Sequence, residues 1–471
     1  MGSCSHVEYV TNLFKQDTIE RMVNHFFAII EQILRNPSIS ISDIELLTQA
    51  EKDKILYQFN NTREEYPKDK QVHQLFEEQV GRNPKQIALI FENQTYTYEF
   101  VNERANQLAR KLRGLGIGKE DVVGLLFNRS VEMILGILAV MKAGAAYVAI
   151  DPDYPAVHVH YILEDSKTQV LLTETKHTDT IAFTGPILDL IAESNGHRNP
   201  KRILRALESY HVALINFVPS MFKVFLNSIH EESIEVLNKL KYVLVAGEAI
   251  SHDVVEQFSS LTRNVTLDNL YGPTEATVIA TSFPLRNAGE YHPLPIGKPI
   301  QNVQVYVMNE SIQLEPIGIV GELYIAGAGV ARGYLNKPEL NEQTFFANPF
   351  VANERMYRTG DLARWLPDGN IEFLGRMDHQ VRIRGYRIEL EEIETRLRSY
   401  EGIADVVVLD KDDSLGNKQL VAYIITTNSI NMSEIKEHLS KQLPSYMIPA
   451  HFMTLDTLPI TTSGKVNRRA L

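Results

Sequence analysis

Short apolar segments alternate with helical patterns through the first third of the chain. The spacing of the apolar residues predicts helices over Phe100 to Leu115 and over Val131 to Lys142. Asp121 to Phe127 and Ala146 to Ile150 are short and apolar enough to be buried strands. Strands that alternate with helices at this spacing indicate parallel βαβ units and therefore an α/β fold.

The same alternation returns later and then gives way to a second pattern. Ala213 to Phe217 and Tyr242 to Ala246 have the character of further buried strands. Beyond about residue 300 the segments become short, β-like and rich in glycine, as at Val303 to Met308 and Gly321 to Ile325. The net negative charge lies entirely upstream of Arg376. We therefore expect a large core of α/β sheets with a β-rich subdomain, followed by a small α+β domain.

Composition excludes several classes of function. The chain has 471 residues, 44% hydrophobic and 23% charged, with a formal net charge of −12, which is typical of a globular protein with several domains. Nucleic acid is not an expected partner, because phosphate neutralisation needs clustered Lys and Arg. The single Cys4 cannot form an internal disulfide, which predicts a reducing compartment, the cytoplasm. No membrane association is expected, since the longest apolar run, Met133 to Met141, is far shorter than the ~20 residues that span a bilayer.

The N-terminal segment has its own character. Residues 17 to 35 place apolar side chains at helical spacing, and one helix cannot bury so wide an apolar face by itself. This face must pack on another part of the chain or on a partner. Asn60 to Lys70 is polar, contains a proline and indicates a linker.

One segment combines the residue types that bind a nucleotide. Asn269-Leu-Tyr-Gly-Pro-Thr-Glu275 follows an apolar strand and breaks it with Gly-Pro, so Thr274 and Glu275 are expected on an exposed turn. A hydroxyl beside a carboxylate suits a phosphate oxygen and its Mg²⁺, and Tyr271 could stack on a base. A tight turn with a surface glutamate explains the same residues without a ligand, so the motif alone leaves both open.

Three later motifs are also ambiguous by themselves, to different degrees. In Tyr357-Arg-Thr-Gly-Asp361 the carboxylate could accept from a ribose diol or cap the following segment. The run Arg382-Ile-Arg-Gly-Tyr-Arg387 could hold an anion or form a solvated face. Thr461-Thr-Ser-Gly-Lys465 presents a lysine that could act on a developing oxyanion, although most such lysines have no catalytic role.

Two other signals are weak. Gly327 to Gly333 resembles a dinucleotide loop, but its last glycine comes one residue late and no βαβ unit of the usual length frames it. His158 and His160 would face one side of a strand, and no third metal ligand follows at a suitable spacing.

The order and spacing of these motifs together resemble the adenylation domains of nonribosomal peptide synthetases, within the adenylate-forming superfamily. The likeness begins at Tyr96-Thr-Tyr-Glu-Phe100 and Met141 to Pro155, and it continues through the motifs above to Gly375 to Glu394 and Ser463 to Arg468. It implies four parts of the chain. These are the last segment of a condensation domain (1–45), a linker (46–70), the adenylation core (71–375) and a mobile C-terminal subdomain (376–471).

The resemblance implies a ligase that uses ATP and Mg²⁺ in two steps. An amino-acid carboxylate attacks the α-phosphate of ATP, and pyrophosphate leaves. The aminoacyl adenylate then passes to the thiol of phosphopantetheine on a separate peptidyl carrier domain. The implied partners are therefore an amino acid, a carrier domain and the condensation domain upstream.

The resemblance also implies roles for individual residues. Tyr271 would stack on adenine, Thr274 would contact the α-phosphate and Asp361 would bind the ribose hydroxyls. The implied nucleotide-binding set is Asn269, Tyr271, Gly272, Thr274, Asp361 and Arg376. Glu275 would hold Mg²⁺, Lys465 would neutralise charge at the α-phosphate, and Asp378 would be the hinge of the C-terminal subdomain.

The sequence departs from the family pattern in two places that bear on its expected activity. Between Thr173 and Phe217 the family carries a Ser/Thr/Gly-rich phosphate loop and a Phe-Asp segment whose acid pairs with the substrate's amino group, and neither is here. On the order of a hundred residues are missing, around 176–205, too many for a shortened loop. The parallel sheet should therefore lack strands and expose apolar edges. The second departure is that the chain stops at Leu471 without a carrier domain.

The rest of the family's substrate pocket is uncharged and mostly apolar, so a charged substrate side chain is disfavoured. These residues are Asn216, Leu244, Ala246, Leu270, Val278 and Ile279. Two hypotheses follow. The chain is either an amino-acid-activating enzyme with compromised turnover or a degenerate domain that serves as a spacer or docking platform. An internal deletion, or a fragment, would account for both the kept motifs and the missing loop.

Overall fold

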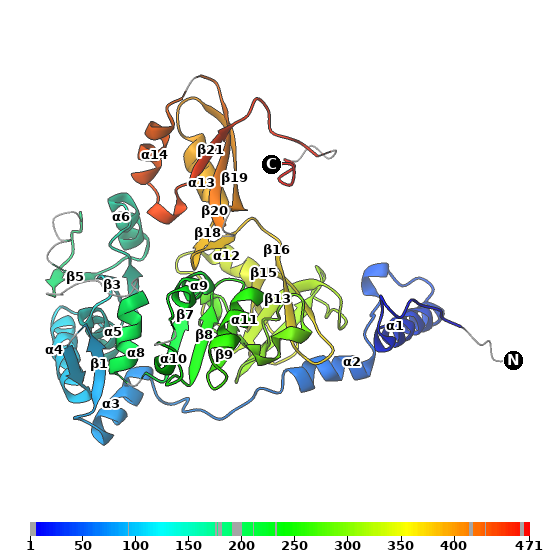
Figure 1. Cartoon of the computed structure of the whole chain (residues 1–471), viewed down its shortest axis with the longest axis horizontal. Helices are drawn as coiled ribbons and strands as arrows, with labels where there is room; N and C mark the ends of the chain where they lie inside the picture. The colour runs from blue at the N-terminus through cyan, green and yellow to red at the C-terminus, as the bar shows by residue number, and fades with distance from the viewer. Residues whose placement is uncertain are drawn as a thin grey trace. The chain divides into compact units, whose positions relative to one another are not determined.

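The computed structural model describes residues 6–92, 94–174, 177, 181–190, 200–210, 212–230, 233–413, 418–428, 430–461 and 466–471. The chain divides into two compact units. The first is Met1–Glu64 with His211–Asp378, and the second is Glu65–Tyr210 with His379–Leu471 (Figure 1). Lys465 and much of the predicted truncation point lie outside the described residues. No helix in the described ranges is long and apolar enough to cross a membrane.

The second unit contains a parallel sheet whose strand order is β4-β3-β5-β6. Its strands are β3 (Val122–Leu126), β4 (Ala146–Ile150), β5 (Val170–Thr173) and β6 (Ile187–Asp189). The helices α4 (Tyr98–Gly114) and α5 (Val131–Ala143) pack their apolar residues on it. Gly144 ends α5 in the left-handed conformation, at φ 87°, which glycine adopts without strain. These elements confirm the predicted alternation, although His158 and His160 lie in helix α6 (Ala156–Asp165), so the prediction of a strand there was wrong.

The first unit contains a second sheet, ordered β11-β10-β9-β8-β7. Its parallel part is β7 (Leu214–Phe217), β8 (Tyr242–Ala246) and β9 (Thr266–Tyr271), and β10 (Thr281–Pro284) and β11 (Lys298–Pro299) run antiparallel. Helices α9 (Pro219–Asn227) and α11 (His252–Leu261) cover one face, where the ring of Phe222 lies 5.5 Å from Phe217 and 5.6 Å from Phe258. The edge strand β7 leaves Leu214 50% exposed.

The β-rich part of the first unit is an antiparallel sheet, β12-β13-β15-β14, with β16 paired to β15. Its strands are β12 (Val303–Met308), β13 (Gly321–Gly327), β14 (Phe345–Ala347), β15 (Arg355–Trp365) and β16 (Ile371–Arg376), with helix α12 at Pro338–Thr344. Trp365 is fully buried in its core beside Val305 and Leu323.

The C-terminal part of the second unit begins with the hairpin β17 (Val381–Ile383) and β18 (Tyr386–Ile388). Strands β19 (Ile403–Asp412), β20 (Lys418–Thr426) and β21 (His451–Thr454) then form one sheet. Helices α13 (Leu390–Arg398) and α14 (Met432–Ser440) bury Ile393, Leu397, Ile435 and Leu439 in its core. The small α+β domain and the mixed α/β core confirm the predicted fold class.

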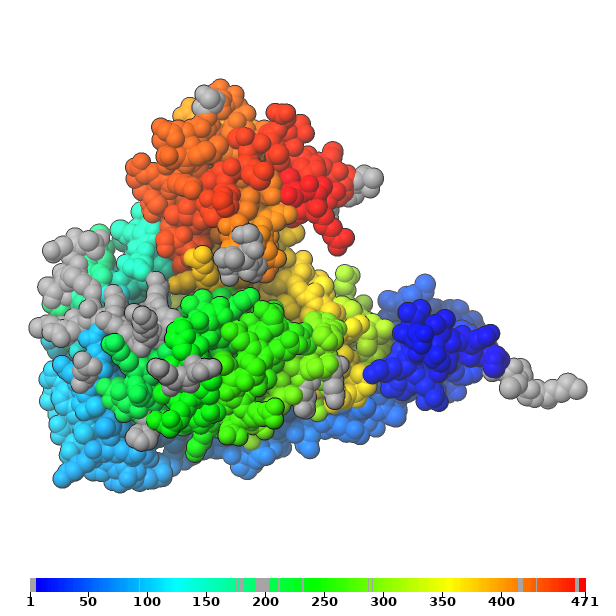
Figure 2. All heavy atoms as spheres, viewed as in Figure 1, coloured from blue at the N-terminus to red at the C-terminus, as the bar shows by residue number. Residues whose placement is uncertain are grey.

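Helix α1 (Gln16–Arg35) confirms the helix predicted near the N-terminus, but none of its residues is buried. Met22 is 57% exposed, Phe26 59% and Leu34 76%. Figure 2 shows the N-terminal segment that contains α1 in dark blue. Ile19, Val23, Ile29 and Ile30 are half-buried, and Nε2 of His25 lies 2.6 Å from Oε2 of Glu51, so the expected packing of the apolar face within the chain is met in part.

The segment after α1 packs on the β-rich sheet instead of running free. It forms α2 (Gln49–Asp53) and the helical turn Lys54–Phe59, and Ile55 is fully buried. The amide of Asn60 donates to the carbonyl of Val305 at 2.9 Å and accepts from its N–H at 2.8 Å. The hydroxyl of Thr62 donates to the carbonyl of Val303 at 2.7 Å. The predicted linker is therefore fixed along β12 at Asn60 and Thr62.

Candidate functional site

The predicted nucleotide motif lies where the carboxyl ends of β7, β8 and β9 meet, the edge at which parallel sheets bind ligands. A Cβ at Gly272 would lie 2.5 Å from the carbonyl oxygen of Val278, so the turn needs glycine there. Thr274 is exposed, as expected. Glu275 is only 9% exposed, however, so the expectation of an exposed glutamate was wrong.

The turn stores backbone strain. Thr277 and Val278 have φ values of 59° and 73°, in the left-handed region that β-branched residues rarely adopt. Each such residue costs about 1–3 kcal/mol, and strain of this kind concentrates at functional sites. The turn is therefore held in one conformation by its surroundings.

The loop after β13 supplies part of that hold. The N–H of Ala331 donates to the carbonyl of Glu275 at 2.8 Å, and the hydroxyl of Thr277 donates to the carbonyl of Gly329 at 2.6 Å. No helix follows this loop directly, which agrees with the view that Gly327 to Gly333 is not a dinucleotide loop. Its glycines instead allow the loop to approach the turn closely.

Tyr334, at the end of this loop, orients the carboxylate of Glu275. Its hydroxyl donates to Oε1 of Glu275 at 2.7 Å. The side chain of Asn341 fixes the backbone of Tyr334, accepting from its N–H at 2.6 Å and donating to its carbonyl at 2.8 Å. Burial, and then the hydrogen bond to Glu275, raise the pKa of Tyr334. Sequence reasoning missed this residue because its motif, Gly-Tyr, gives no sign of what the hydroxyl contacts.

Asp361 lies on β15, is 5% exposed, and accepts hydrogen bonds on both carboxylate oxygens. The hydroxyl of Tyr271 donates to Oδ2, and Nη1 of Arg376 donates to Oδ1 at 2.7 Å. Arg376 also donates to both oxygens of Asp378, from Nε and Nη2, at 2.6 Å each. Burial by itself would lower the pKa of Arg376, but the hydrogen bonds to Asp378 and the charge of Asp361 raise it overall. The structure thus brings together four of the predicted site residues.

A local irregularity of β15 aims Asp361 at this cluster. The pairing of β15 shifts register on both sides of Asp361, against β13 and against β16, which is the signature of a bulge. The buried Glu322 accepts from the N–H of Gly360 at 3.1 Å, and the hydroxyl of Thr359 accepts from the N–H of Asp361 at 3.0 Å. The sequence predicted the acid and the glycine but not Glu322.

The other predicted site residues lie outside this cluster or at its edge. Asn269 is buried, and its amide donates to the carbonyl of Pro295 at 3.0 Å, so its side chain ties the end of β9 to the segment before β11. Asp378 is the last residue of the first unit. The predicted pocket residues on β7, β8 and β9 share one face of the sheet by register: Asn216, Leu244, Ala246 and Leu270.

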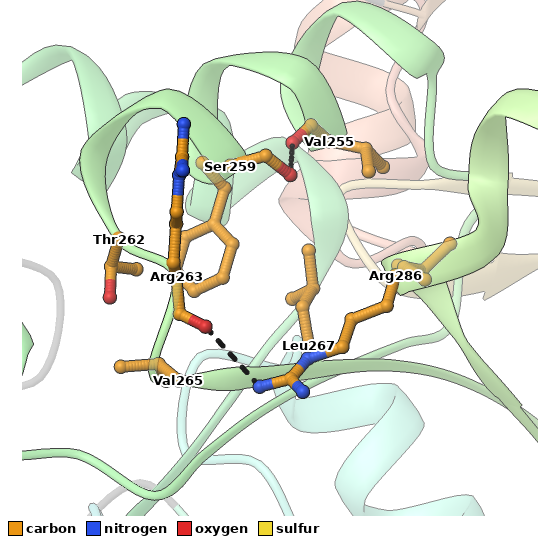
Figure 3. Close-up of a pocket in the computed structure, with 9 residues that line it drawn as sticks. Val255, Ser259, Thr262, Arg263, Val265, Leu267 and Arg286 are labelled. Carbon is orange, nitrogen blue, oxygen red and sulfur yellow. Dashed lines mark hydrogen bonds between the residues drawn. The ribbon is translucent and has the colours of Figure 1, made fainter.

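A separate pocket of about 470 Å³ lies between α11, β9 and the short helix Leu285–Glu290 (Figure 3). Leu267 and Phe258 line it, and Arg286 donates to the carbonyl of Arg263 at 3.3 Å at its side. None of the predicted site residues lines it, so it is not the candidate site.

Family models match most of the chain in three parts. The model of AMP-binding enzymes matches residues 76–193 and 189–335, and the model of the AMP-binding enzyme C-terminal domain matches 392–465. A condensation domain model matches 4–56.

Relatives and solved structures agree with these matches. Gramicidin S synthase 2 of Brevibacillus brevis is 37% identical over 563 residues, covering 99% of this chain and 13% of that protein. Bacitracin synthase 3 of Bacillus licheniformis is 37% identical over 551 residues, covering 98% of this chain and 9% of that protein. A four-domain nonribosomal peptide synthetase bound to AMP and glycine superposes with a TM-score of 0.69 at 27% identity, over 98% of this chain and 41% of that one.

The chain therefore belongs to the family of AMP-binding enzymes. Within that family it is an adenylation domain of the nonribosomal peptide synthetase type, preceded by the end of a condensation domain.

Proposed function

We propose that this chain activates an amino acid as its adenylate with ATP and Mg²⁺ and then transfers it to phosphopantetheine on a separate peptidyl carrier domain. The observation that carries the proposal is the buried Asp361, whose two oxygens accept from Tyr271 and Arg376 at the carboxyl end of the sheet. A hydroxyl already bound to this carboxylate is the same kind of donor that a ribose diol offers.

The other roles follow from the position of each group. The exposed hydroxyl of Thr274 suits a phosphate oxygen, and the ring of Tyr271 would lie against the base. Mg²⁺ is usually held by one or two carboxylates together with substrate phosphates. Glu275 fits that pattern as a single carboxylate next to the exposed Thr274. When bound, the ion would neutralise charge on the phosphates.

Lys465 and Asp378 complete the proposed machinery. Lys465 would neutralise charge at the α-phosphate as the substrate carboxylate attacks, a task for a preorganised cation. Asp378 would be the hinge residue of a C-terminal subdomain that moves between the two half-reactions. The condensation domain upstream and the carrier domain are the proposed partners, and the cytoplasm is the proposed location.

The missing phosphate loop supports a second candidate, a degenerate domain that serves as a spacer or docking platform. The family model matches in two pieces that meet at residues 189–193, and the alignments to the relatives are longer than the 471-residue chain. Relatives therefore contain residues that this chain lacks. Without the loop, pyrophosphate would lose its main hydrogen-bond donors on departure.

Amino-acid-dependent exchange of pyrophosphate into ATP separates the two candidates. We expect exchange above that of a Lys465→Ala variant for at least one amino acid, with ATP binding measured beside it by calorimetry. Exchange above the variant would exclude a pure spacer. The absence of both exchange and ATP binding would exclude the enzyme.

A Tyr334→Phe variant is expected to weaken divalent-cation binding by roughly 10-fold to 100-fold, because a hydrogen bond to a charged group is worth about 1.5–3 kcal/mol. The measurement is calorimetric titration of Mn²⁺ into the chain saturated with ATP. Tyr306→Phe is the matched control, since this buried tyrosine contacts Asn348 and not Glu275. Equal cation affinity in the two variants would contradict the role given to Tyr334.

A further inference from the structure

Asp268 lies beside the predicted pocket residues of the sheet but was not itself predicted to belong to the pocket. In β9 the pairing register places Asp268 opposite Leu244, which in turn lies opposite Asn216 of β7. Asp268 therefore shares a face with Leu244, Ala246 and Leu270, because side chains of a strand alternate between faces. Its neighbour Leu267 lines the pocket on the opposite, α11 side (Figure 3).

The carboxylate of Asp268 is poorly satisfied in the protein. Its Oδ1 is buried and has no hydrogen-bond partner among the described residues. The charge of Arg286 acts on it, but Nη2 of Arg286 donates to the carbonyl of Arg263 on the α11 side. Burial raises the pKa of Asp268, and Arg286 opposes this shift only in part. A half-buried acid without a partner is costly unless a ligand supplies the missing donor.

We propose that Asp268 is a specificity-determining residue that binds the side-chain ammonium of a basic amino-acid substrate. This inference rests on the proposed function, and it names the substrate class. It also revises the expectation from the sequence that a charged side chain is disfavoured, which considered only the uncharged residues of the pocket.

The depth of Asp268 in the sheet favours a side-chain ammonium over the α-ammonium. The substrate carboxylate must lie near the α-phosphate, beyond the carboxyl end of β9. Asp268 precedes Leu270 by two residues, so it lies about 6–7 Å deeper along the strand. A side chain of four or five bonds spans about 5–6 Å. Its methylene groups would lie along Leu244, Ala246 and Leu270, as the stems of basic side chains commonly do.

The test compares L-ornithine with L-norvaline, which has the same carbon skeleton and lacks only the terminal ammonium. Each is titrated calorimetrically into the full chain in the presence of ATP and Mg²⁺. We expect ornithine to bind at least tenfold more tightly than norvaline. Asp268→Asn should remove this preference by lowering the affinity for ornithine to that for norvaline.

Asp253→Asn is the matched control, because Asp253 lies on α11 and pairs with Lys223 at 3.3 Å. It should keep the preference for ornithine. If the native chain binds ornithine and norvaline equally, the inference is overturned and the proposed function stands. The inference is also overturned if Asp268→Asn weakens the binding of both ligands equally, because Asp268 would then bind the α-ammonium. An absence of ATP binding and of binding by any amino acid would overturn the proposed function together with the inference.

Stability provides a readout that does not depend on ligand binding. Because the folded state raises the pKa of Asp268 above its ordinary 3.8, it binds a proton that the unfolded chain has released. Stability is therefore lost as pH rises from about 4 through the raised pKa. Asp268→Asn should flatten this dependence and raise the urea midpoint at pH 7. A lower midpoint would assign Asp268 a structural role and overturn the inference.

Discussion

Asp361→Asn is expected to weaken AMP binding by roughly 100-fold or more and to destabilise the first unit by about 1–3 kcal/mol. The loss of affinity follows because two ribose hydroxyls would each lose a hydrogen bond to a charged group, worth about 1.5–3 kcal/mol. The loss of stability follows because Arg376, 15% exposed, would lose one of its two carboxylate partners and keep only Asp378. Calorimetric titration with AMP and urea unfolding measure the two effects separately.

Asp368→Asn is the control for this prediction. Asp368 accepts from the hydroxyl of Tyr291 at 2.5 Å, as Asp361 accepts from Tyr271, but it is exposed and far from the nucleotide motif in the sequence. It should bind AMP as the native chain does. Unchanged AMP affinity in Asp361→Asn would show that the nucleotide lies elsewhere, whatever the effect on stability.

Asn60→Ala is expected to destabilise the first unit by about 2–4 kcal/mol. The substitution would leave the N–H and the carbonyl of Val305, a fully buried residue, without their partner. Each unsatisfied buried group costs about 1–3 kcal/mol. The measurement is the free energy of unfolding from urea titration of the full chain, followed by a probe of the first unit such as Trp365 fluorescence.

Asn61→Ala is the matched control, because it is the same substitution at the next residue, whose side chain is exposed. It should alter the free energy of unfolding by less than about 0.5 kcal/mol. Equal effects of the two substitutions would mean that the segment after α1 is not anchored through Asn60.

The predicted secondary structure was correct where one period of apolar residues dominates a segment. The helices α4 and α5 and the strands β3, β4, β7 and β8 follow directly from such periods. His158 and His160 show the limit of this reasoning. Alternation over a few residues favoured a strand, but the apolar residues of α6 meet the core at helical spacing, with Val159 and Leu163 buried.

The candidate site was predictable for residues whose chemistry is local. Thr274 belongs to a turn that its own neighbours specify, whereas the glycine before Asp361 lies within β15 and not in the turn that the sequence predicted. The burial of Glu275 was not predictable, because it depends on Tyr334, 59 residues away in the chain. The pairing of Tyr271 with Asp361 spans 90 residues and was likewise hidden.

The sequence alone determined the order of elements, the mixed α/β fold and the residues that resemble a nucleotide site, because periodicity and turn chemistry act over a few residues. Only the tertiary structure decided which of these groups hydrogen-bond to the same carboxylate, how the segment around Asn60 is fixed, and that Asp268 shares a sheet face with predicted pocket residues. The reason is physical: strand register and burial arise from contacts between distant segments, and these contacts determine whether a charged group finds a partner.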